Sequence, residues 1–369
     1  MVVSANSSWN IVNFRSGLIR AIGHAGYEPI VIAPFDEACN RRLAELGVEH
    51  IDVPVQRSGL NPLADVALLL RYRTIVRQLR PAAFLGFTIK PNIYGCLAAR
   101  SLGIPAIANI SGLGTVFSDD GWLMRLALRL YRIALGGAHR VFFQNPDDRM
   151  EFISRGIVGE EQAGLLPGSG VDLQQFAPAP LPPNGPVFLL VARLLVDKGV
   201  REYVAAARIL RSEFPSARFQ LLGPIDEGNP TGISQTELER WIASEDLEYL
   251  GSVEDVRDAI RGATAIVLPS YYREGVPRSL LEGAAMARPL IATDMPGCRE
   301  LVVNQPGGIA CRPRDAGSLA DAMRELAQLT SNEWSAMGLA SRQLIERRFG
   351  EEKIIRAYLD ELARVAPIA

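Results

Sequence analysis

Short apolar runs that alternate with longer helical patterns constrain the fold of this chain more than any other feature of its sequence. Eight such runs can be read: PIVIAP (29–34), AAFLGF (82–87), PAIANI (105–110), RVFFQ (140–144), VFLLVAR (187–193), RFQLLG (218–223), AIVLPS (265–270) and PLIATD (289–294). Strands that are apolar on both faces are typical of parallel sheets covered by helices on both sides. The alternation therefore predicts an α/β protein of the doubly wound type.

The length of the chain and one proline-rich stretch predict two domains. A chain of 369 residues, 48% of them apolar, exceeds what one ordinary core accommodates. Between two rounds of strand and helix lies APAPLPPNGP (177–186), which has no helical period. We predict an N-terminal domain over residues 1–178 and a C-terminal domain over residues 179–350. Apolar residues at helical spacing in EEKIIRAYLDELARV (351–365) predict that segment 351–369 forms a helix packed back on the first domain.

Charge and cysteine content narrow the classes of function. A formal net charge of -2 does not suit a protein that neutralises a polyphosphate, so we expect no nucleic-acid partner. The four cysteines are scattered, without a CxxC pair or a neighbouring histidine, which predicts no zinc site and a reduced, cytoplasmic chain. No basic leader precedes an apolar run, and no run approaches the roughly 18 apolar residues of a spanning helix.

Two cations follow the first predicted strand of the second half. In VARLLVDKG, Arg193 and Lys198 come just after the strand, and Gly199 follows them. In an open parallel sheet, ligands bind beyond the carboxyl ends of the strands, near helix N-termini. The two cations would suit a diphosphate there, although a lone Arg or Lys is equally typical of a solvated surface.

The stretch YYREGVPRSLLEGAAMARP (271–289) places Glu274 and Glu282 eight positions apart, after another predicted strand. Pro277 suits the first turn of a helix, which needs no N–H at that position. Three backbone amides would then be directed toward an anion, those of Arg278, Ser279 and Leu280. Glu282 would accept hydrogen bonds from a ribose diol, and Glu274 from a second hydroxylated group. A helix-cap role explains either glutamate alone, but not the two together with the preceding cations.

Together these motifs resemble those of the GT-B nucleotide-sugar glycosyltransferases of family four, the large retaining group. The hallmark Glu-x7-Glu is present as Glu274 to Glu282, followed by GAAMARPLIATDMPGCRELV. The element Gly-Arg-Leu-x-x-x-Lys-Gly appears as ARLLVDKG with Ala192 for Gly, and GSGVDLQQF (168–176) is similar to an Asn-Gly-Val-Asp element with Ser169 for Asn. The resemblance covers nearly the whole chain. It implies two Rossmann-like domains whose parallel sheets face a central cleft, with the donor on the C-terminal domain.

The resemblance also implies roles for the donor-site residues. Arg193 and Lys198 would bind the diphosphate and neutralise its charge as the leaving group departs. Glu282 would hold the ribose hydroxyls, and Glu274 would contact the donor sugar. The expected donor site comprises Arg193, Lys198, Glu274, Gly275, Val276, Ser279, Leu280 and Glu282, with Arg193, Lys198 and Glu274 as its catalytic members. We expect no metal and no other cofactor, because the sequence contains no Asp-x-Asp motif.

The first half departs from the family pattern at two loops. Many members have Gly-Gly after the first strand and a histidine after a central strand. Here the loops read NSSWN (6–10) and NISGLGTVF (109–117), with Ser111 near the histidine position. Acceptor recognition therefore stays open. The candidate acceptor residues are Asn6, Ser7, Asn10, Lys90, Ser111 and Gly112. Lys90 would meet an acceptor diphosphate or, alternatively, is an ordinary surface lysine.

The stretches GFTIKPNIYG (86–95) and ISGLGTVF resemble a subset of the family that extends polyprenyl-diphosphate-linked sugars in bacterial polysaccharide or glycoprotein assembly. That subset includes acetamido-sugar transferases that act on a bacillosamine-type lipid carrier. The resemblance implies retaining transfer of a hexose or N-acetylhexosamine, from UDP-GalNAc or UDP-GlcNAc, to a polyprenyl-diphosphate saccharide. Two alternatives stay open: a nucleotide-sugar epimerase or hydrolase of the same fold, and a non-catalytic nucleotide-sugar-binding module.

A local excess of positive charge predicts contact with an anionic membrane. Residues 57–140 contain eleven Lys or Arg and three Asp. In GWLMRLALRLYRIALGG (121–137), three arginines fall on one helical face, and LLLRYRTIVRQLR (68–80) gives a similar pattern. A core helix with one basic solvent face has the same pattern. On the membrane interpretation, the protein would attach peripherally to the cytoplasmic face of the inner membrane.

Overall fold

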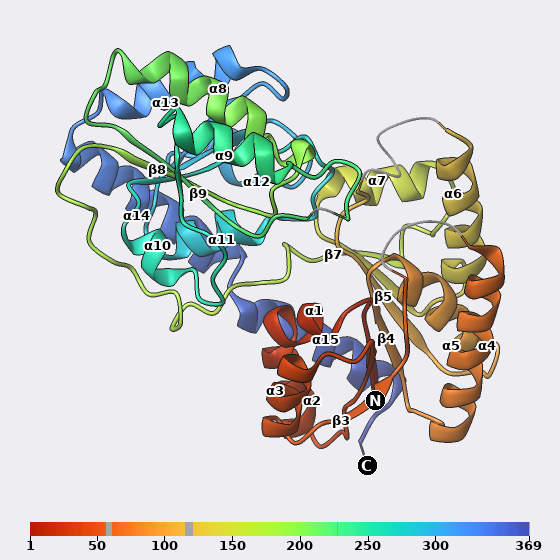
Figure 1. Ribbon diagram of the computed structural model, residues 1–369. Coiled ribbons are helices and arrows are strands. Elements are labelled where there is room, and N and C mark those ends of the chain that lie inside the picture. The colour runs from red at the N-terminus through yellow and green to blue at the C-terminus, as the bar shows by residue number, and fades with distance from the viewer. Residues whose placement is uncertain (57–60, 115–120, 227, 369) are drawn as a thin grey trace. The chain divides into compact units, whose positions relative to one another are not determined.

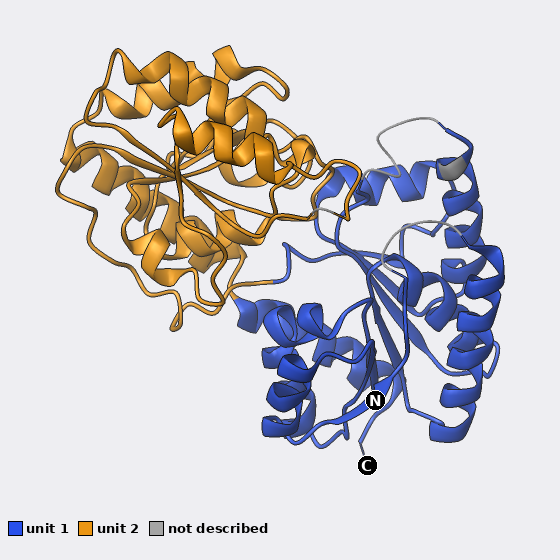
Figure 2. Cartoon of the chain, viewed as in Figure 1, with its two compact units in different colours: residues 1–169, 351–369 blue, residues 170–350 orange. Residues whose placement is uncertain are grey.

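The computed structural model divides into two compact units, residues 1–169 with 351–369, and residues 170–350 (Figure 2). The structure describes the chain except for residues 57–60, 115–120, 227 and 369. The final helix, α15 (Glu351–Val365), belongs to the first unit. The proline-rich stretch 177–186 lies within the second unit.

The first unit is built on a seven-stranded parallel sheet in the order β3-β2-β1-β4-β5-β6-β7 (Figure 1). Its strands are β1 (Val2–Ser4), β2 (Ile30–Ala33), β3 (Glu49–Asp52), β4 (Phe84–Phe87), β5 (Ala106–Ile110), β6 (Arg140–Phe143) and β7 (Ala163–Leu165). The four predicted runs of this half form β2, β4, β5 and β6, as predicted. The sequence patterns missed β3 and β7 because these edge strands are not buried on both faces, and β1 because it is very short.

Helices cover both faces of this sheet (Figure 1). One face packs against α1 (Ser8–Phe14), α2 (Ser16–His24), α3 (Glu37–Glu45) and α15, and the other against α4 (Pro62–Leu79), the π-helical turn η1 (Pro91–Gly95), α5 (Cys96–Arg100), α6 (Trp122–Leu135) and α7 (Pro146–Ser154). Neighbouring residues of a strand enter opposite cores, as Phe84 and Leu85 do in β4. This is why the strands are apolar at successive positions.

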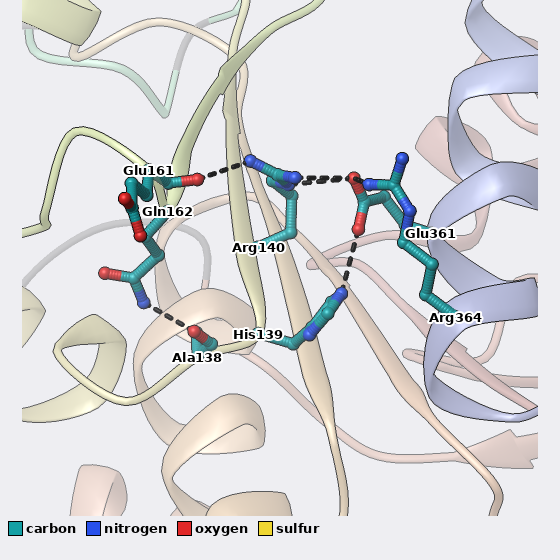
Figure 3. Close-up of polar contacts among 7 residues, drawn as sticks. All are labelled: Ala138, His139, Arg140, Glu161, Gln162, Glu361 and Arg364. Atoms are coloured by element: carbon teal, nitrogen blue, oxygen red, sulfur yellow. Dashed lines mark hydrogen bonds and ion pairs between the residues drawn. The ribbon is translucent and has the colours of Figure 1, made fainter.

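The attachment of α15 to the first unit combines apolar burial with a charged contact. Ile354, Tyr358 and Leu362 are buried in the core on the α1–α3 side of the sheet. The Glu361 carboxylate accepts a hydrogen bond from Arg140 Nε at 2.9 Å and lies 2.8 Å from His139 Nε2, at the beginning of β6 (Figure 3). Burial opposes ionisation, but these hydrogen bonds hold the pKa of Glu361 below its ordinary value.

The second unit repeats the architecture with a six-stranded parallel sheet in the order β10-β9-β8-β11-β12-β13. Its strands are β8 (Val187–Val191), β9 (Arg218–Leu222), β10 (Glu248–Tyr249), β11 (Ala265–Leu268), β12 (Leu290–Thr293) and β13 (Gly308–Cys311). The four predicted runs form β8, β9, β11 and β12. The two strands that the patterns missed, β10 and β13, are again the edges of the sheet.

Helices also cover both faces of the second sheet. One face packs against α8 (Val200–Arg211), α9 (Gln235–Ala243) and α13 (Ala316–Ala327), and the other against α10 (Arg257–Arg261), α11 (Arg278–Ala285), α12 (Arg299–Val302) and α14 (Ser331–Arg348). Leu189 of β8 enters the α11 side, whereas its neighbours Phe188 and Leu190 enter the α8 side.

Two buried arginines hold the segment before β8 against this unit. Arg288 Nη2 donates to the carbonyl of Pro180 at 2.9 Å, and Arg342 Nη1 donates to the carbonyl of Phe176 at 2.9 Å. Burial lowers the pKa of Arg288 to about 10. Since these guanidinium groups satisfy carbonyls that no helix or strand satisfies, they fix the proline-rich stretch in place.

Candidate functional site: the strand-order reversals of the two sheets

In each sheet the strand order reverses beside the first strand of the unit. In the second unit β8 lies between β9 and β11, so the loops after β8 and β11 leave the sheet at adjacent positions. They lead to α8 and α11, which cover opposite faces. Ligands of doubly wound sheets bind at such reversals, beyond the carboxyl ends of the strands.

Backbone contacts join the two loops of the second-unit reversal. After β8 the chain forms a 3-10 turn, η3 (Val196–Lys198), and the carbonyl of Asp197 accepts hydrogen bonds from the amides of Tyr271 and Tyr272 at 3.0 and 3.1 Å. Gly199 then adopts φ +74, and a Cβ there would lie 2.2 Å from the carbonyl oxygen of Pro269. The close approach of the two loops therefore requires glycine after Lys198.

This arrangement brings Lys198 and Glu274 into a direct ion pair. Their side chains are 14% and 13% exposed, and Ser270 Oγ donates a hydrogen bond to the same Glu274 oxygen at 3.2 Å. Lys198 Nζ also lies 5.0 Å from the centre of the Tyr272 ring. Burial, and then the charge of Glu274, raises the pKa of Tyr272. The reversal thus holds a compact, partly desolvated charge pair.

The loop that carries Glu274 rests on the segment before α12. Gly297 has φ +84, and a Cβ on it would lie 1.8 Å from the carbonyl oxygen of Gly275. Val276 is buried in the core with Leu280, so any contact of these two residues with a ligand would be through their backbone. Pro277 is the N-cap of α11, and the helix begins at Arg278, one residue later than the sequence indicated.

Glu282 lies on α11 one turn after Arg278 and is paired with it. Arg278 Nε is 2.8 Å from Glu282 Oε1, and Arg278 Nη1 donates to the carbonyl of Gly170 at 2.8 Å. Burial raises the pKa of Glu282, although the adjacent guanidinium opposes this shift. Ser279 follows Arg278 in the first turn of the helix and is partly exposed.

Arg193 is placed differently from Lys198. Its side chain is 51% exposed, and Nη1 lies 2.9 Å from Asp226 Oδ2 in the loop after β9. The structure therefore brings Lys198 and Glu274 together but shows Arg193 paired with Asp226. Within the ranges that the structure describes, no group of three His, Cys, Asp or Glu side chains could hold a metal ion.

The equivalent reversal of the first unit lies between β1 and β4. There the amide of Asn6 donates to Thr88 Oγ1 at 3.1 Å, which ties the loop after β1 to the loop after β4. Thr88 has φ +67, a conformation that costs a β-branched residue roughly 1–3 kcal/mol, and the π-helical turn η1 follows shortly after it. Ser7 Oγ accepts from the Asn10 amide at 3.2 Å and so caps α1.

Lys90 forms an ion pair inside the first unit. Its Nζ lies 2.7 Å from Asp65 Oδ1 on α4, and the two side chains are 13% and 8% exposed. Lys90 is therefore not a surface lysine, and its charge is already neutralised by a buried carboxylate. Burial, and then the charge of Asp65, raises the pKa of Tyr94, which packs beside this pair.

The remaining acceptor candidates follow β5. Ser111 is exposed, and Gly112 turns the chain with φ +105. Residues 115–117 of the predicted loop lie outside the described residues. Sequence reasoning missed Thr88 and Ser270 as functional candidates, although Thr88 comes directly after the predicted strand 82–87 and Ser270 is the last residue of the predicted run 265–270. Their position at a strand end was the available signal.

Two family models match the chain in succession. The model of the glycosyl transferase 4-like domain matches residues 12–168, and that of glycosyl transferases group 1 matches residues 185–328. Among curated proteins, the N,N'-diacetylbacillosaminyl-diphospho-undecaprenol alpha-1,3-N-acetylgalactosaminyltransferase of Campylobacter jejuni is 28% identical in an alignment of 375 positions that covers 96% of this chain and 96% of that protein. The putative colanic acid glycosyltransferase WcaL of Escherichia coli is 29% identical over 51% of this chain and 48% of its own length.

Solved structures share the fold over the whole chain. A glycosyltransferase from Rickettsia africae matches with a TM-score of 0.81 at 16% identity, covering 100% of this chain and 98% of that one. HepE of Anabaena in complex with UDP and glucose matches with a TM-score of 0.78 at 16% identity, covering 98% of each. The predicted fold, two parallel-sheet α/β units of GT-B type, is confirmed. The chain is therefore a glycosyltransferase of GT-B fold, in which residues 12–168 belong to the glycosyl transferase 4-like domain and residues 185–328 to the glycosyl transferases group 1.

Proposed function

We propose that this glycosyltransferase moves a hexose or N-acetylhexosamine from a UDP-linked donor to a polyprenyl-diphosphate-linked saccharide, with retention of the anomeric configuration. The observation that carries the proposal is the Lys198–Glu274 pair at the reversal of the second sheet. The named activity of the Campylobacter relative and the UDP bound to HepE support the choice of acceptor and nucleotide.

The donor would bind where Lys198 and Glu274 now neutralise each other. A diphosphate would attract the ammonium of Lys198 away from Glu274, whose carboxylate would then accept hydrogen bonds from sugar hydroxyls. Glu282 would exchange its Arg278 contact for the ribose diol, and Arg193 would leave Asp226 to reach the diphosphate. The amides of Gly275, Val276, Ser279 and Leu280 lie on this loop and the first turn of α11.

The reaction would depend on stabilising a departing nucleotide diphosphate. The bond from the anomeric carbon to the phosphate oxygen breaks, and a bond to the acceptor hydroxyl oxygen forms on the same face. The acceptor proton passes to the departing phosphate. Lys198 would stabilise the charge that develops on that phosphate, in a site where low exposure strengthens the interaction. Neither metal nor cofactor enters this proposal.

The acceptor would bind at the reversal of the first sheet. We place Asn6, Asn10, Ser111 and Gly112 at the acceptor saccharide, whose hydroxyls suit neutral donors and acceptors. Asn10 Oδ1 is buried without a hydrogen-bond partner in the described structure, so a hydroxyl donor there would satisfy it. Ser7 and Lys90 would act through the scaffold, because they cap α1 and pair with Asp65 respectively.

A release assay tests this function. The purified protein is incubated with UDP-GalNAc, UDP-GlcNAc, UDP-glucose or GDP-mannose, with and without a detergent-solubilised polyprenyl-diphosphate saccharide, and free nucleotide diphosphate is followed. We expect release that requires both one UDP-sugar and the acceptor. Release without acceptor would instead indicate a hydrolase or epimerase, and no release from any donor would indicate a binding module.

Contact with an anionic membrane is also part of the proposal, since the acceptor would be anchored in lipid. On α4 the exposed residues Leu63, Val66, Leu70, Arg73 and Arg77 form one stripe, and Leu63 is 84% exposed. Among the side chains of α6 that the structure describes, the exposed ones are Trp122, Arg125, Leu126, Arg129, Arg132 and Ile133, and Trp122 is 68% exposed. Leu126 and Ile133 are thus exposed beside the arginines of this helix. No described helix is long and apolar enough to cross a bilayer.

Apolar side chains mixed with arginines suit the interface of an anionic bilayer, where each basic residue contributes about 1 kcal/mol. Vesicle sedimentation tests this contact. We expect binding to vesicles rich in phosphatidylglycerol, and its loss in the double variant Leu63→Ser/Leu70→Ser. The matched control is Leu339→Ser, which removes an exposed leucine from α14 of the second unit. Equal binding by all three proteins would contradict the assignment of this surface.

A further inference from the structure

Asn109 is the centre of a group of buried hydrogen bonds at the carboxyl end of β5. The residue is 1% exposed, its Nδ2 donates to Tyr358 Oη on α15 at 2.8 Å, and its Oδ1 accepts from Gln144 Nε2 at 3.2 Å. Its backbone carbonyl accepts from Asn92 Nδ2, in η1, at 2.7 Å. Four segments of the first unit therefore meet at Asn109, two positions before Ser111.

Tyr358 is the member of this group that lies farthest away in the sequence. Its ring is buried, with ring centres 5.2 Å from Phe142 and 5.8 Å from Phe87. Burial raises the pKa of Tyr358 to about 12, so its hydroxyl stays protonated at neutral pH. A phenylalanine would fill the same space. Packing therefore explains why an aromatic ring is needed at this position, and the hydrogen bond to Asn109 explains the role of its hydroxyl.

The attachment of α15 does not depend on this hydroxyl. Glu361 binds Arg140 and His139 (Figure 3), and Tyr27 Oη donates to the carbonyl of Ala366 at 2.8 Å. Apolar residues on the same helix are also buried in the first unit. Because the helix is held at several other positions, the Tyr358 hydroxyl can be removed without detaching it.

We propose that Tyr358 is a positioning residue that sets the acceptor turn at Ser111 and Gly112 through Asn109. The inference rests on the proposed function, which places the acceptor at that turn. Without the hydroxyl, the buried Asn109 amide loses its acceptor, and it must reorient or admit water. Either response shifts the end of β5, from which the Gly112 turn starts. The last helix thereby helps to define the acceptor site.

The test compares the hydroxyls of two tyrosines, Tyr358 on α15 and Tyr27, which contacts Ala366 just after that helix ends. Tyr358→Phe removes the hydroxyl that faces Asn109, whereas Tyr27→Phe, the matched control, removes only a tie to the end of the helix. In steady-state assays we expect Tyr358→Phe to raise the acceptor KM roughly tenfold, with donor KM and kcat within about twofold of wild type. We expect Tyr27→Phe to leave all three within about twofold.

Two results would contradict the inference. An unchanged acceptor KM in Tyr358→Phe would show that the Asn109 group does not act on the acceptor. An equal rise in Tyr27→Phe would show that only the attachment of the helix matters. Hydrogen exchange of a peptide over residues 105–114 gives a readout that needs no substrate: it should quicken in Tyr358→Phe alone. If wild type transfers no sugar, the proposed function fails, and this exchange result still decides whether Tyr358 positions the turn.

Discussion

The two sheets reverse their strand order at equivalent places, but the side chains at the two reversals differ in charge. In the second unit, Lys198 and Glu274 form an ion pair between the loops that follow β8 and β11. In the first unit, Asn6 and Thr88 join the corresponding loops by a neutral hydrogen bond. Lys90, the cation that follows β4, is paired with Asp65 on a helix instead.

The difference suits the proposed division of two ligands between the two units. A charge pair at low exposure can open to receive a nucleotide sugar, because the diphosphate replaces Glu274 beside Lys198 and the sugar hydroxyls replace Lys198 beside Glu274. Neutral amides and hydroxyls can exchange hydrogen bonds with a saccharide without leaving a charge unpaired. We therefore propose donor binding at the second unit and saccharide binding at the first; three variants test this division, and a fourth probes a contact outside it.

The largest effect is expected for Lys198→Ala, which removes the cation from the second reversal. Loss of one electrostatic contact to a developing charge costs roughly 10²–10³ in kcat. We expect turnover to fall by that amount while donor KM changes much less, as measured by nucleotide release. Arg201→Ala removes an exposed cation from the neighbouring helix α8 and serves as the control. Equal losses of turnover in both variants would show that Lys198 acts only through the general positive charge of the surface.

Lys90→Met tests whether the lysine of the first unit stabilises the fold and takes no part in the reaction. Removing it leaves Asp65 buried without a counter-charge, so we expect the free energy of unfolding to fall by about 3 kcal/mol. Turnover of the folded protein should stay within about twofold of wild type. The double variant Lys90→Met/Asp65→Leu should recover the stability in thermal unfolding. A loss of turnover without a loss of stability would place Lys90 in the reaction instead.

Glu282→Ala should weaken binding of the nucleotide rather than slow the chemical step. Loss of the hydrogen bonds from two ribose hydroxyls is expected to raise the Kd for UDP roughly tenfold. Calorimetric titration with UDP measures this change. The control is Glu300→Ala on α12, which removes an acidic residue paired with Arg348 elsewhere in the same unit. An unchanged Kd for UDP in Glu282→Ala would show that Glu282 does not bind the ribose.

The smallest effect is expected for Glu361→Gln, outside both reversals. Burial opposes ionisation, but Arg140, His139 and Arg364 hold the pKa of Glu361 below its ordinary value of 4.5. The stabilisation is therefore complete above pH 4.5 and is lost as the pH falls through the lower folded-state pKa. We expect the variant to lose about 1 kcal/mol at pH 7, and the difference in Tm to shrink below pH 4.5. A difference in Tm that does not change with pH would show that the ionised Glu361 carboxylate is not the source of the stabilisation.

The sequence predicted those parts of the fold in which local pattern and burial agree. Strands buried on both faces, such as β4 and β11, were predicted from their apolar runs. Edge strands such as β3 and β13 were not, because their exposed positions interrupt the run. The helix over residues 351–365 was found with its bounds, since one apolar face recurs along all of it.

The candidate site divides in the same way. The proximity of Lys198 and Glu274 followed from their places after strands, because parallel strands end at one edge of the sheet. The partners of Lys90 and Asn109 did not follow. Asp65 lies on a helix 25 positions earlier, and Tyr358 lies 249 positions from Asn109. Such pairs depend on tertiary packing, which no local pattern in the sequence records.

Hydrogen exchange measured with and without saturating UDP reports which of the two units binds the nucleotide. We predict slower exchange in peptides covering residues 193–200 and 271–283, on either side of the second reversal. Peptides covering residues 2–12 and 84–95, at the first reversal, should be unchanged. Slower exchange confined to the first-unit peptides would contradict the assignment of the donor to the second unit, and with it the functional difference between the two reversals.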